Sequence, residues 1–126
     1  MTNQDLPDTQ AAARGELCAE GLDWSGADLQ GVNLEHALMS GINLSRARLQ
    51  GASLRWAYLK QANLRGADLR AVDFTGAYLR GADLRDADLR GANLWGALLW
   101  DARLEGTCLD SAKLEQSCGA VLNAGL

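Results

Sequence analysis

Residues 62–81 read ANLRGADLRAVDFTGAYLRG and contain one five-residue pattern four times over. The pattern is a small residue, then Asp or Asn, a large apolar residue, a polar residue and often Gly. It runs without interruption through residues 22–116 as 19 units, and every unit has Leu, Trp, Met or Phe at the apolar position. Ala fills the small position in 14 of the 19 units, so two apolar positions recur every five residues.

A period of five excludes a long helix. Five residues turn an α-helix by about 500°, so the apolar stripe would shift by roughly 140° at each unit and never form a face. In an extended segment, by contrast, the small and large apolar residues are two apart and point to the same side, while the Asp or Asn between them points away. A corner residue such as Gly then turns the chain.

Four such sides close a square coil of about twenty residues, and coils stack at the strand spacing of about 4.8 Å. The sequence therefore predicts an all-β solenoid of a little under five coils. Its core would be made of stacked ladders of large residues, of which we single out Leu44, Leu64, Leu84, Leu104 and Phe74.

The repeat resembles that of the pentapeptide-repeat proteins. The resemblance covers residues 22–116 and implies a right-handed quadrilateral β-helix. The first coil departs from the usual pattern, because large residues stand at the small inward position; these are Leu22, Val32 and Ile42. Trp24 occupies an apolar position in the first unit, where we expect it to close the end of the column.

Both ends of a solenoid expose backbone and core, so caps are expected. Residues 1–21 break the register, since position 14 would place an Arg inward, and they are expected to form an N-terminal cap with a short helix beginning near Asp8. Residues 22–116 form the solenoid. Residues 117–126 contain Val121, Leu122 and Leu126 and are expected to form a C-terminal cap.

Composition places the chain among soluble domains. The net charge is −4, no apolar stretch approaches the length of a membrane span, and the first residues do not read as a secretory signal. Three Cys without such a signal indicate reduced thiols, so we expect a cytoplasmic protein with no membrane partner.

Catalytic chemistry has few residues to use. His36 is the only His and lies at an outward corner, and no Cys or His spacing is typical of a metal site. Cys18 and Cys118 are about 24 Å apart on the stacking estimate, too far for a disulfide. The redox state of these two residues and of Cys108 stays open. We therefore expect no catalytic residues, no metal, no cofactor and no enzyme activity.

Charge is unevenly distributed along the repeat. Residues 46–90 carry nine bases and five acids, whereas the segments on either side are acidic. We call the arginines at the centre of this region the basic waist: Arg65, Arg70, Arg80, Arg85 and Arg90. Three of them follow an Asp by two residues, which predicts ion pairs on the outer surface.

The family resemblance also implies a candidate function. Some pentapeptide-repeat proteins bind DNA gyrase or topoisomerase by imitating duplex DNA, and so protect it from quinolones or other poisons. A DNA mimic needs acidity along its whole length, and the basic waist disfavours it. Binding of nucleic acid itself is disfavoured by the net negative charge and the interleaved Asp residues.

One surface carries apolar and aromatic side chains at outward positions that are mostly polar on the other surfaces. Residues twenty apart stack, so Leu38, Tyr58, Tyr78 and Leu98 form an outward ladder, with Trp100 on the same face and Trp56 and Trp95 at the adjoining corner. Exposed aromatic residues beside Arg are typical of protein interfaces. We interpret the chain as a non-enzymatic interaction scaffold that binds a protein partner or a second copy of itself; the alternatives are that a capping segment covers the face, or that the stacked aromatic rings only stiffen the sheet.

The register is tested by Leu84→Asp. A carboxylate at this inward position is expected to unfold the chain, because an unpaired buried charge costs several kcal/mol, about as much as a small domain has. Asp83→Ala, one residue earlier but outward, is expected to be tolerated. Thermal melts that show the two variants to be equally stable would contradict the register.

Overall fold

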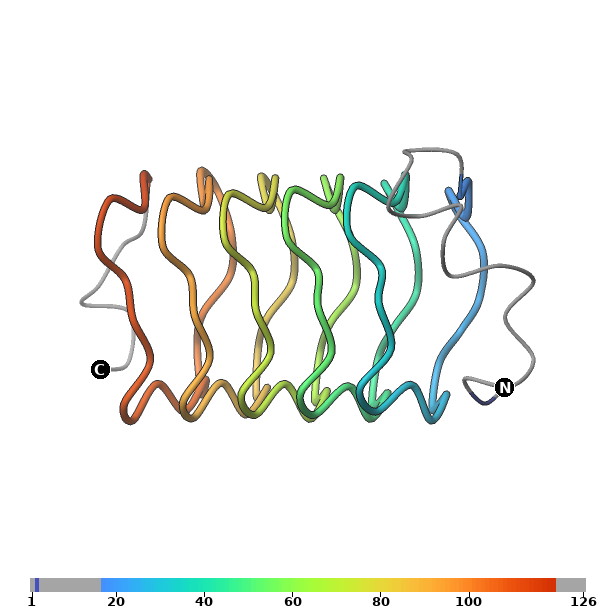
Figure 1. Cartoon of the computed structure of the whole chain (residues 1–126), viewed down its shortest axis with the longest axis horizontal. Coiled ribbons are helices and arrows are strands. Elements are labelled where there is room, and N and C mark those ends of the chain that lie inside the picture. Colours follow the sequence, from blue (N-terminus) through green and yellow to red (C-terminus); the bar gives the residue numbers. More distant parts are fainter. Residues whose placement is uncertain (1, 3–16, 120–126) are drawn as a thin grey trace.

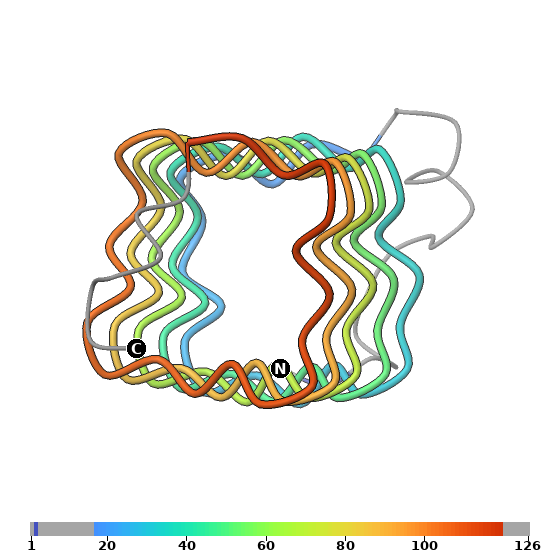
Figure 2. The same ribbon diagram turned by 90° about the vertical axis from the view of Figure 1, so that its left-hand side faces the viewer.

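The computed structural model describes Thr2 and residues 17–119, which form a column of stacked square coils. Figure 1 shows the coils from the side, and Figure 2 shows the square outline along the column. No described residue is helical. The strands are single-residue parallel bridges between positions twenty apart, from Cys18 with Leu38 to Leu98 with Cys118, and Thr2 adds one bridge to Asp28.

Four ladders of outward residues define four faces. The first we call the aromatic face, with Cys18, Leu38, Tyr58, Tyr78, Leu98 and Cys118 at the centres of its sides. The second, third and fourth faces follow in chain order. Their ladders begin at Asp23, Asp28 and Asn33, respectively, so the third face lies opposite the aromatic face.

Each coil is joined to the next by the same three backbone hydrogen bonds on every side, one of which lies at the corner, where the Gln61 N–H donates to the carbonyl of Arg80 at 2.8 Å. On the aromatic face the Tyr58 N–H donates to the carbonyl of Ala37 at 2.9 Å, and the Leu59 N–H donates to the carbonyl of Tyr78 at 2.8 Å. The inward residues beside these bonds fill the column. Leu44, Leu64, Leu84 and Phe74 have no exposed surface, and Leu104 is 4% exposed.

The corners are tight turns with a left-handed residue. At a typical corner the Ala67 N–H donates to the carbonyl of Leu64 at 3.1 Å, and Gly66 has φ +69°. A positive φ at the third residue alone defines a type II turn, which favours Gly. All twenty corner residues from Gly21 to Gln116 have positive φ, and nine of them, Trp56 included, are not Gly.

Long side chains at the corners lie over the Gly of the next coil. A Cβ added to Gly76 would be 2.1 Å from the indole of Trp56, and one added to Gly106 would be 2.3 Å from Oδ1 of Asp86. Gly76 is buried for this reason. The glycines at these two corners therefore serve the neighbouring coil as well as their own turn.

The repeat is longer than expected. Leu17 and Ala19 are buried, the Ala19 N–H donates to the carbonyl of Leu38, and Cys18 bridges Leu38, so residues 17–21 are a unit of the column rather than part of a cap. At the other end Cys118 still pairs with Leu98. The column thus spans 102 residues, from 17 to 118, which at twenty per coil is just over five coils. The expected cap helix and most of the C-terminal cap fall in residues 3–16 and 120–126, outside the described residues.

The expectation for the first coil was wrong in one residue. Val32 and Ile42 are buried, but Leu22 is 46% exposed. Leu22 stands in the first complete coil, where the second face has no further coil stacked upon it. Trp24, on the same side, is only 6% exposed, in keeping with a large residue that closes this end.

Gly76→Ala is expected to destabilise the chain more than Gly51→Ala. Both corners have φ near +70°, but a Cβ at Gly51 would meet nothing within 4 Å, whereas at Gly76 it would meet the Trp56 ring. The shared backbone strain costs roughly 1 kcal/mol, and the clash adds about 1–3 kcal/mol. Urea unfolding measures both.

The control is the same pair of substitutions in a Trp56→Ala background. There Gly76→Ala is expected to cost no more than Gly51→Ala, because the ring is gone. An excess cost at Gly76 that persists without the indole would show that the Trp56 contact is not its cause.

Candidate interaction face

The aromatic face carries a stripe of exposed rings. The rings of Tyr58 and Tyr78 are stacked, with centroids 4.7 Å apart and planes within 5°. Both are exposed, whereas Leu38 and Leu98, the ladder residues on either side of them, are half-buried. The i to i+20 bridges force this stacking, because they hold the two residues at adjacent rungs of one ladder.

Large side chains flank the ladder at both corners. Lys60, Arg80 and Trp100 follow the ladder at the corner with the second face, while Trp56 and Trp95 stand at the corner with the fourth. Trp95 is 47% and Trp100 56% exposed, so the described chain leaves them open to solvent. A hollow of about 310 Å³ lies between ladder and flank, lined by Ser40, Tyr58, Lys60, Tyr78, Arg80, Leu98 and Trp100.

On the other three faces the outward residue of many sides stabilises the corner that follows it. The carboxylate or amide oxygen of an outward Asp or Asn accepts from the backbone N–H two residues later, as Asn63 does from Arg65 at 3.0 Å. This is an Asx turn, and it satisfies an N–H that the coil-to-coil bonds leave out. Nine ladder positions on the second, third and fourth faces make it: 23, 33, 43, 63, 68, 73, 83, 88 and 93.

The aromatic face lacks this hydrogen bond at every coil. Its Leu, Tyr and Cys side chains offer no such acceptor, and in the described chain the N–H groups of Lys60, Arg80 and Trp100 donate to no protein group. The other faces lack the Asx turn only at scattered coils, such as those of Arg48 and Arg103. The hydrogen bond that stabilises the corners of the other faces is therefore missing along this whole face.

The basic waist is extensively neutralised. Arg70, Arg85 and Arg90 hold the Asp two residues before them, with N to O distances of 2.6 to 2.7 Å. Arg65 lies 3.7 Å from Asp86, and Arg80 lies 3.9 Å from Asp101, each in the following coil. The expected local pairs are present, and the pairs between coils were not anticipated from the sequence.

These contacts shift the acid pKa values. The hydrogen-bonded Arg85 guanidinium lowers the pKa of Asp83 below its usual 3.8, and the Arg85 backbone N–H adds to this, while burial opposes it. Arg70 and Arg90 lower the pKa of Asp68 and Asp88 in the same way. All three carboxylates are thus held in the charged form.

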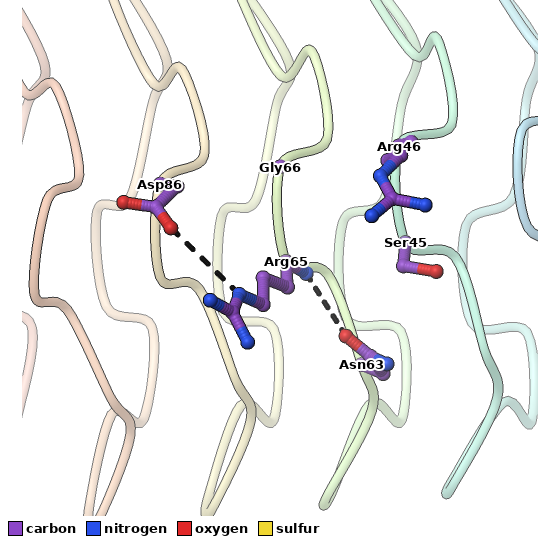
Figure 3. A pocket seen from close by; sticks show the side chains of 6 residues that line it. All are labelled: Ser45, Arg46, Asn63, Arg65, Gly66 and Asp86. Atoms are coloured by element: carbon purple, nitrogen blue, oxygen red, sulfur yellow. Dashed lines mark hydrogen bonds and ion pairs between the residues drawn. The ribbon is translucent and has the colours of Figure 1, made fainter.

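A second hollow, of about 450 Å³, is polar and lies at the corner after the second face (Figure 3). Its lining includes Arg46, Arg65 and Asp86. The Arg65 side chain turns toward Asp86, away from Arg46, so the two guanidinium groups do not converge on one point. This hollow is not arranged to hold an anion.

The described residues contain no group of three or more His, Cys, Asp or Glu side chains that could hold a metal ion. The same part of the chain has no helix long and apolar enough to cross a membrane. His36 is exposed at its corner with φ +63°. The structure brings together no set of groups typical of catalysis in this region.

The sequence interpretation overlooked how the cysteines are placed. Cys18 and Cys118 were assigned to caps, yet they are the first and last residues of the aromatic ladder, and both are exposed. Cys108 is on the opposite, third face. The spacing of exactly five coils between positions 18 and 118 was the available signal, because any two residues separated by a multiple of twenty share a face.

The chain belongs to the pentapeptide-repeat family. The family model for pentapeptide repeats (8 copies) matches residues 27–66, 47–86 and 77–118. The fold is accordingly the right-handed quadrilateral β-helix expected from the repeat. A comparison with curated protein sequences found no match.

Solved structures of the family resemble the chain. A pentapeptide repeat protein from the Arabidopsis thaliana thylakoid lumen is 32% identical, with a TM-score of 0.74 over 81% of this chain and 70% of that one. Rfr23, a pentapeptide repeat protein from the cyanobacterium Cyanothece 51142, is 33% identical, with a TM-score of 0.69 over 71% of this chain. The match covers 61% of Rfr23.

QnrB1, a plasmid-mediated fluoroquinolone resistance protein, is more distant. It is 22% identical, with a TM-score of 0.50 over 75% of this chain and 59% of that one. At this identity the likeness extends to the fold alone.

The Asp–Arg pairs predict a dependence of stability on pH. Because their pKa values are lowered on folding, Asp68, Asp83 and Asp88 contribute stability that is present above about pH 4 and is lost as the pH falls through the folded pKa values. The triple variant Asp68→Asn/Asp83→Asn/Asp88→Asn keeps the Asx acceptor but not the charge. It is expected to lose less stability than the native chain between about pH 6 and about pH 2.5.

Urea unfolding at the two pH values provides the measurement. Equal losses for both proteins would mean that these three pairs do not govern the acid limb of stability.

Proposed function

We propose that this protein is a non-enzymatic scaffold that binds protein through its aromatic face, and that a second copy of the chain is a partner. The observation that carries the proposal is the loss of the Asx turn along that face. Tyr and Leu at the ladder positions cannot accept this hydrogen bond, so Asp or Asn would stabilise the corner better. The loss of a stabilising hydrogen bond along one whole face, with exposed aromatic rings in its place, is typical of a functional surface.

The chemistry of the face suits a protein partner. Tyr, Trp and Arg are the residues enriched at interaction hot spots, and here they surround an apolar hollow. The rings are also fixed before binding, because Tyr58 and Tyr78 stack on a rigid backbone ladder. Little side-chain entropy is therefore lost on association. A capping segment that covers the face is a competing explanation, and the sedimentation experiment below distinguishes the two.

A gyrase-directed DNA mimic is the runner-up. QnrB1 is a fluoroquinolone resistance protein, but this chain resembles it only in fold. The second and third faces alternate acids with arginines such as Arg70 and Arg85, which pair with their neighbours. Such a surface lacks the continuous negative charge of a nucleic-acid backbone. No feature of the described residues favours this function over the interaction scaffold.

The proposal is tested by sedimentation of the native chain beside Trp95→Ser/Trp100→Ser. The native protein is expected to dimerise at micromolar concentration, since each buried aromatic side chain contributes on the order of 2 kcal/mol. The double variant is expected to be monomeric, and circular dichroism checks that it is folded. A native chain that stays monomeric at about 1 mM would contradict self-association through this face.

A further inference from the structure

The aromatic face leaves a row of backbone donors unpaired along its edge with the second face. In the unit 57–61 the N–H groups bond to other coils or across the corner, except for the one that lies two residues after the ladder residue. On the other faces many of these remaining N–H groups donate to an Asx turn, but in the described chain none on the aromatic face has a protein acceptor. Four of them belong to residues that line the apolar hollow: Ser40, Lys60, Arg80 and Trp100.

The hollow beside this row is positively charged. Among the described residues its lining contains Lys60 and Arg80 but no Asp or Glu. Lys60 has no ion-pair partner in the described chain. Arg80 lies 3.9 Å from Asp101, with side-chain exposures of 66% and 80%, and so exposed a pair holds the guanidinium weakly. The acid in the same row, Glu20, stands two coils before Lys60.

The second face shows how these donors hold a carboxylate. Arg85 follows its ladder residue by two positions, as Arg80 does on the aromatic face. The Arg85 backbone N–H donates to Oδ1 of Asp83 at 3.1 Å, while Nε donates to the same oxygen at 2.9 Å and Nη2 donates to Oδ2 at 2.6 Å. Arg70 and Arg90 each hold an Asp in the same way. The main chain and the side chain of one Arg thus bind one carboxylate together.

Arg80 has the same donors without the carboxylate. Tyr78 stands at the ladder position where Asp83 stands on the second face, so the Arg80 N–H has no acceptor and the guanidinium reaches only the following coil. Lys60 follows Tyr58 in the coil before and repeats the arrangement with an ammonium group. The carboxylate that is missing from this edge can therefore be supplied by another molecule.

We propose that the aromatic face binds an acidic segment of a partner protein, and that the backbone N–H and guanidinium of Arg80 hold one of its carboxylates. A second carboxylate lies near Lys60, one rung of about 4.8 Å away. An apolar side chain of the segment enters the hollow beside Leu98 and Trp100. This rests on the function proposed above, because it uses the same face, and it adds the chemistry of a partner other than a second copy.

A carboxylate on a protein segment suits this edge better than other acceptors. Asx turns such as that of Asn63 show that a side-chain oxygen fits this N–H at about 3.0 Å. A carboxylate gains more than an amide beside Lys60 and Arg80, because hydrogen bonds between charged groups are about twice as strong as neutral ones. A nucleic acid carries continuous negative charge, which the net charge of −4 disfavours.

The test follows the backbone amide signals of the isotope-labelled full chain by NMR. A blocked peptide of alternating aspartate and leucine is added in excess, up to about 1 mM. The amide signals of Lys60 and Arg80 are expected to move downfield as their N–H groups gain an acceptor, whereas that of Arg65, which already donates to Asn63, is expected to stay. The same peptide with asparagine in place of aspartate is expected to bind about tenfold more weakly.

Arg80→Gln and Arg65→Gln form a matched pair of variants. Each removes one exposed guanidinium that lies near an Asp of the following coil, at 3.9 Å and 3.7 Å respectively. The net charge changes equally, but only the Arg80 backbone N–H is unpaired. Arg80→Gln is expected to weaken binding of the aspartate peptide by about tenfold, and Arg65→Gln is expected to leave it unchanged. Equal affinities of the two variants would contradict the role of Arg80.

Tyr78→Asp supplies the carboxylate from within the chain. The variant is expected to fold, because Asp occupies ladder positions on the other faces, and to move the Arg80 amide downfield without any peptide. Tyr78→Leu removes the same ring but adds no acceptor, and it is the control for the loss of the ring. An Arg80 amide with the same position in both variants would show that this edge cannot hold a carboxylate, which overturns the proposal.

The remaining outcomes separate the acidic partner from the function proposed above. Equal binding of the aspartate and asparagine peptides would overturn the acidic partner and leave the face as a protein-binding surface. An aspartate peptide that moves neither amide at about 1 mM would also overturn it. A duplex DNA fragment that moves both amides at a lower concentration than the peptide would overturn the assignment to a protein. Sedimentation alone decides self-association, so a monomeric chain that binds the aspartate peptide contradicts the second copy but not the acidic segment.

Discussion

The backbone hydrogen bonds between residues about twenty positions apart hold this molecule together. Each side of each coil contributes a single bridge, and consecutive bridges follow one another only because every side has five residues and every corner turns by the same amount. The inward leucines pack as ladders as a result of this register. Even residues that disfavour a positive φ, such as Trp56, adopt it at the corners, because leaving the register would break the bonds to both neighbouring coils.

The core and the outline of the fold were predictable from the period of five, since Leu84 or Phe74 is inward in any square coil of this length. The ends were harder to predict. Residues 1–21 were interpreted as a cap because position 14 would place an Arg inward, yet the backbone of the unit 17–21 is fully in register. The repeat pattern also placed Leu22 in the core. The pattern predicts which residues of a side point inward, but it does not predict whether another coil covers that side.

The candidate face was only partly visible in the sequence. The aromatic ladder follows directly from the twenty-residue spacing of its members. The same spacing also predicts that Cys18 and Cys118 lie at the two ends of this ladder. Two features depend on three-dimensional detail instead. The Trp56 ring lies over Gly76 because corner side chains lean toward the next coil, and the ion pairs of Arg65 and Arg80 reach acids in the following coil. The period alone does not give the direction in which a long side chain extends.

The twenty-residue register also restricts how such a chain can change length. Removal of a single unit of five would turn all following residues by a quarter of the square, so that Tyr78 and Leu98 would leave the face of Tyr58 and join the polar ladder beside it. Removal or duplication of four units together would keep every ladder intact. A surface built from residues twenty apart is therefore kept only when whole coils are inserted or removed between its ladder residues, so insertions and deletions within an aromatic face of this kind are expected to come in multiples of twenty residues.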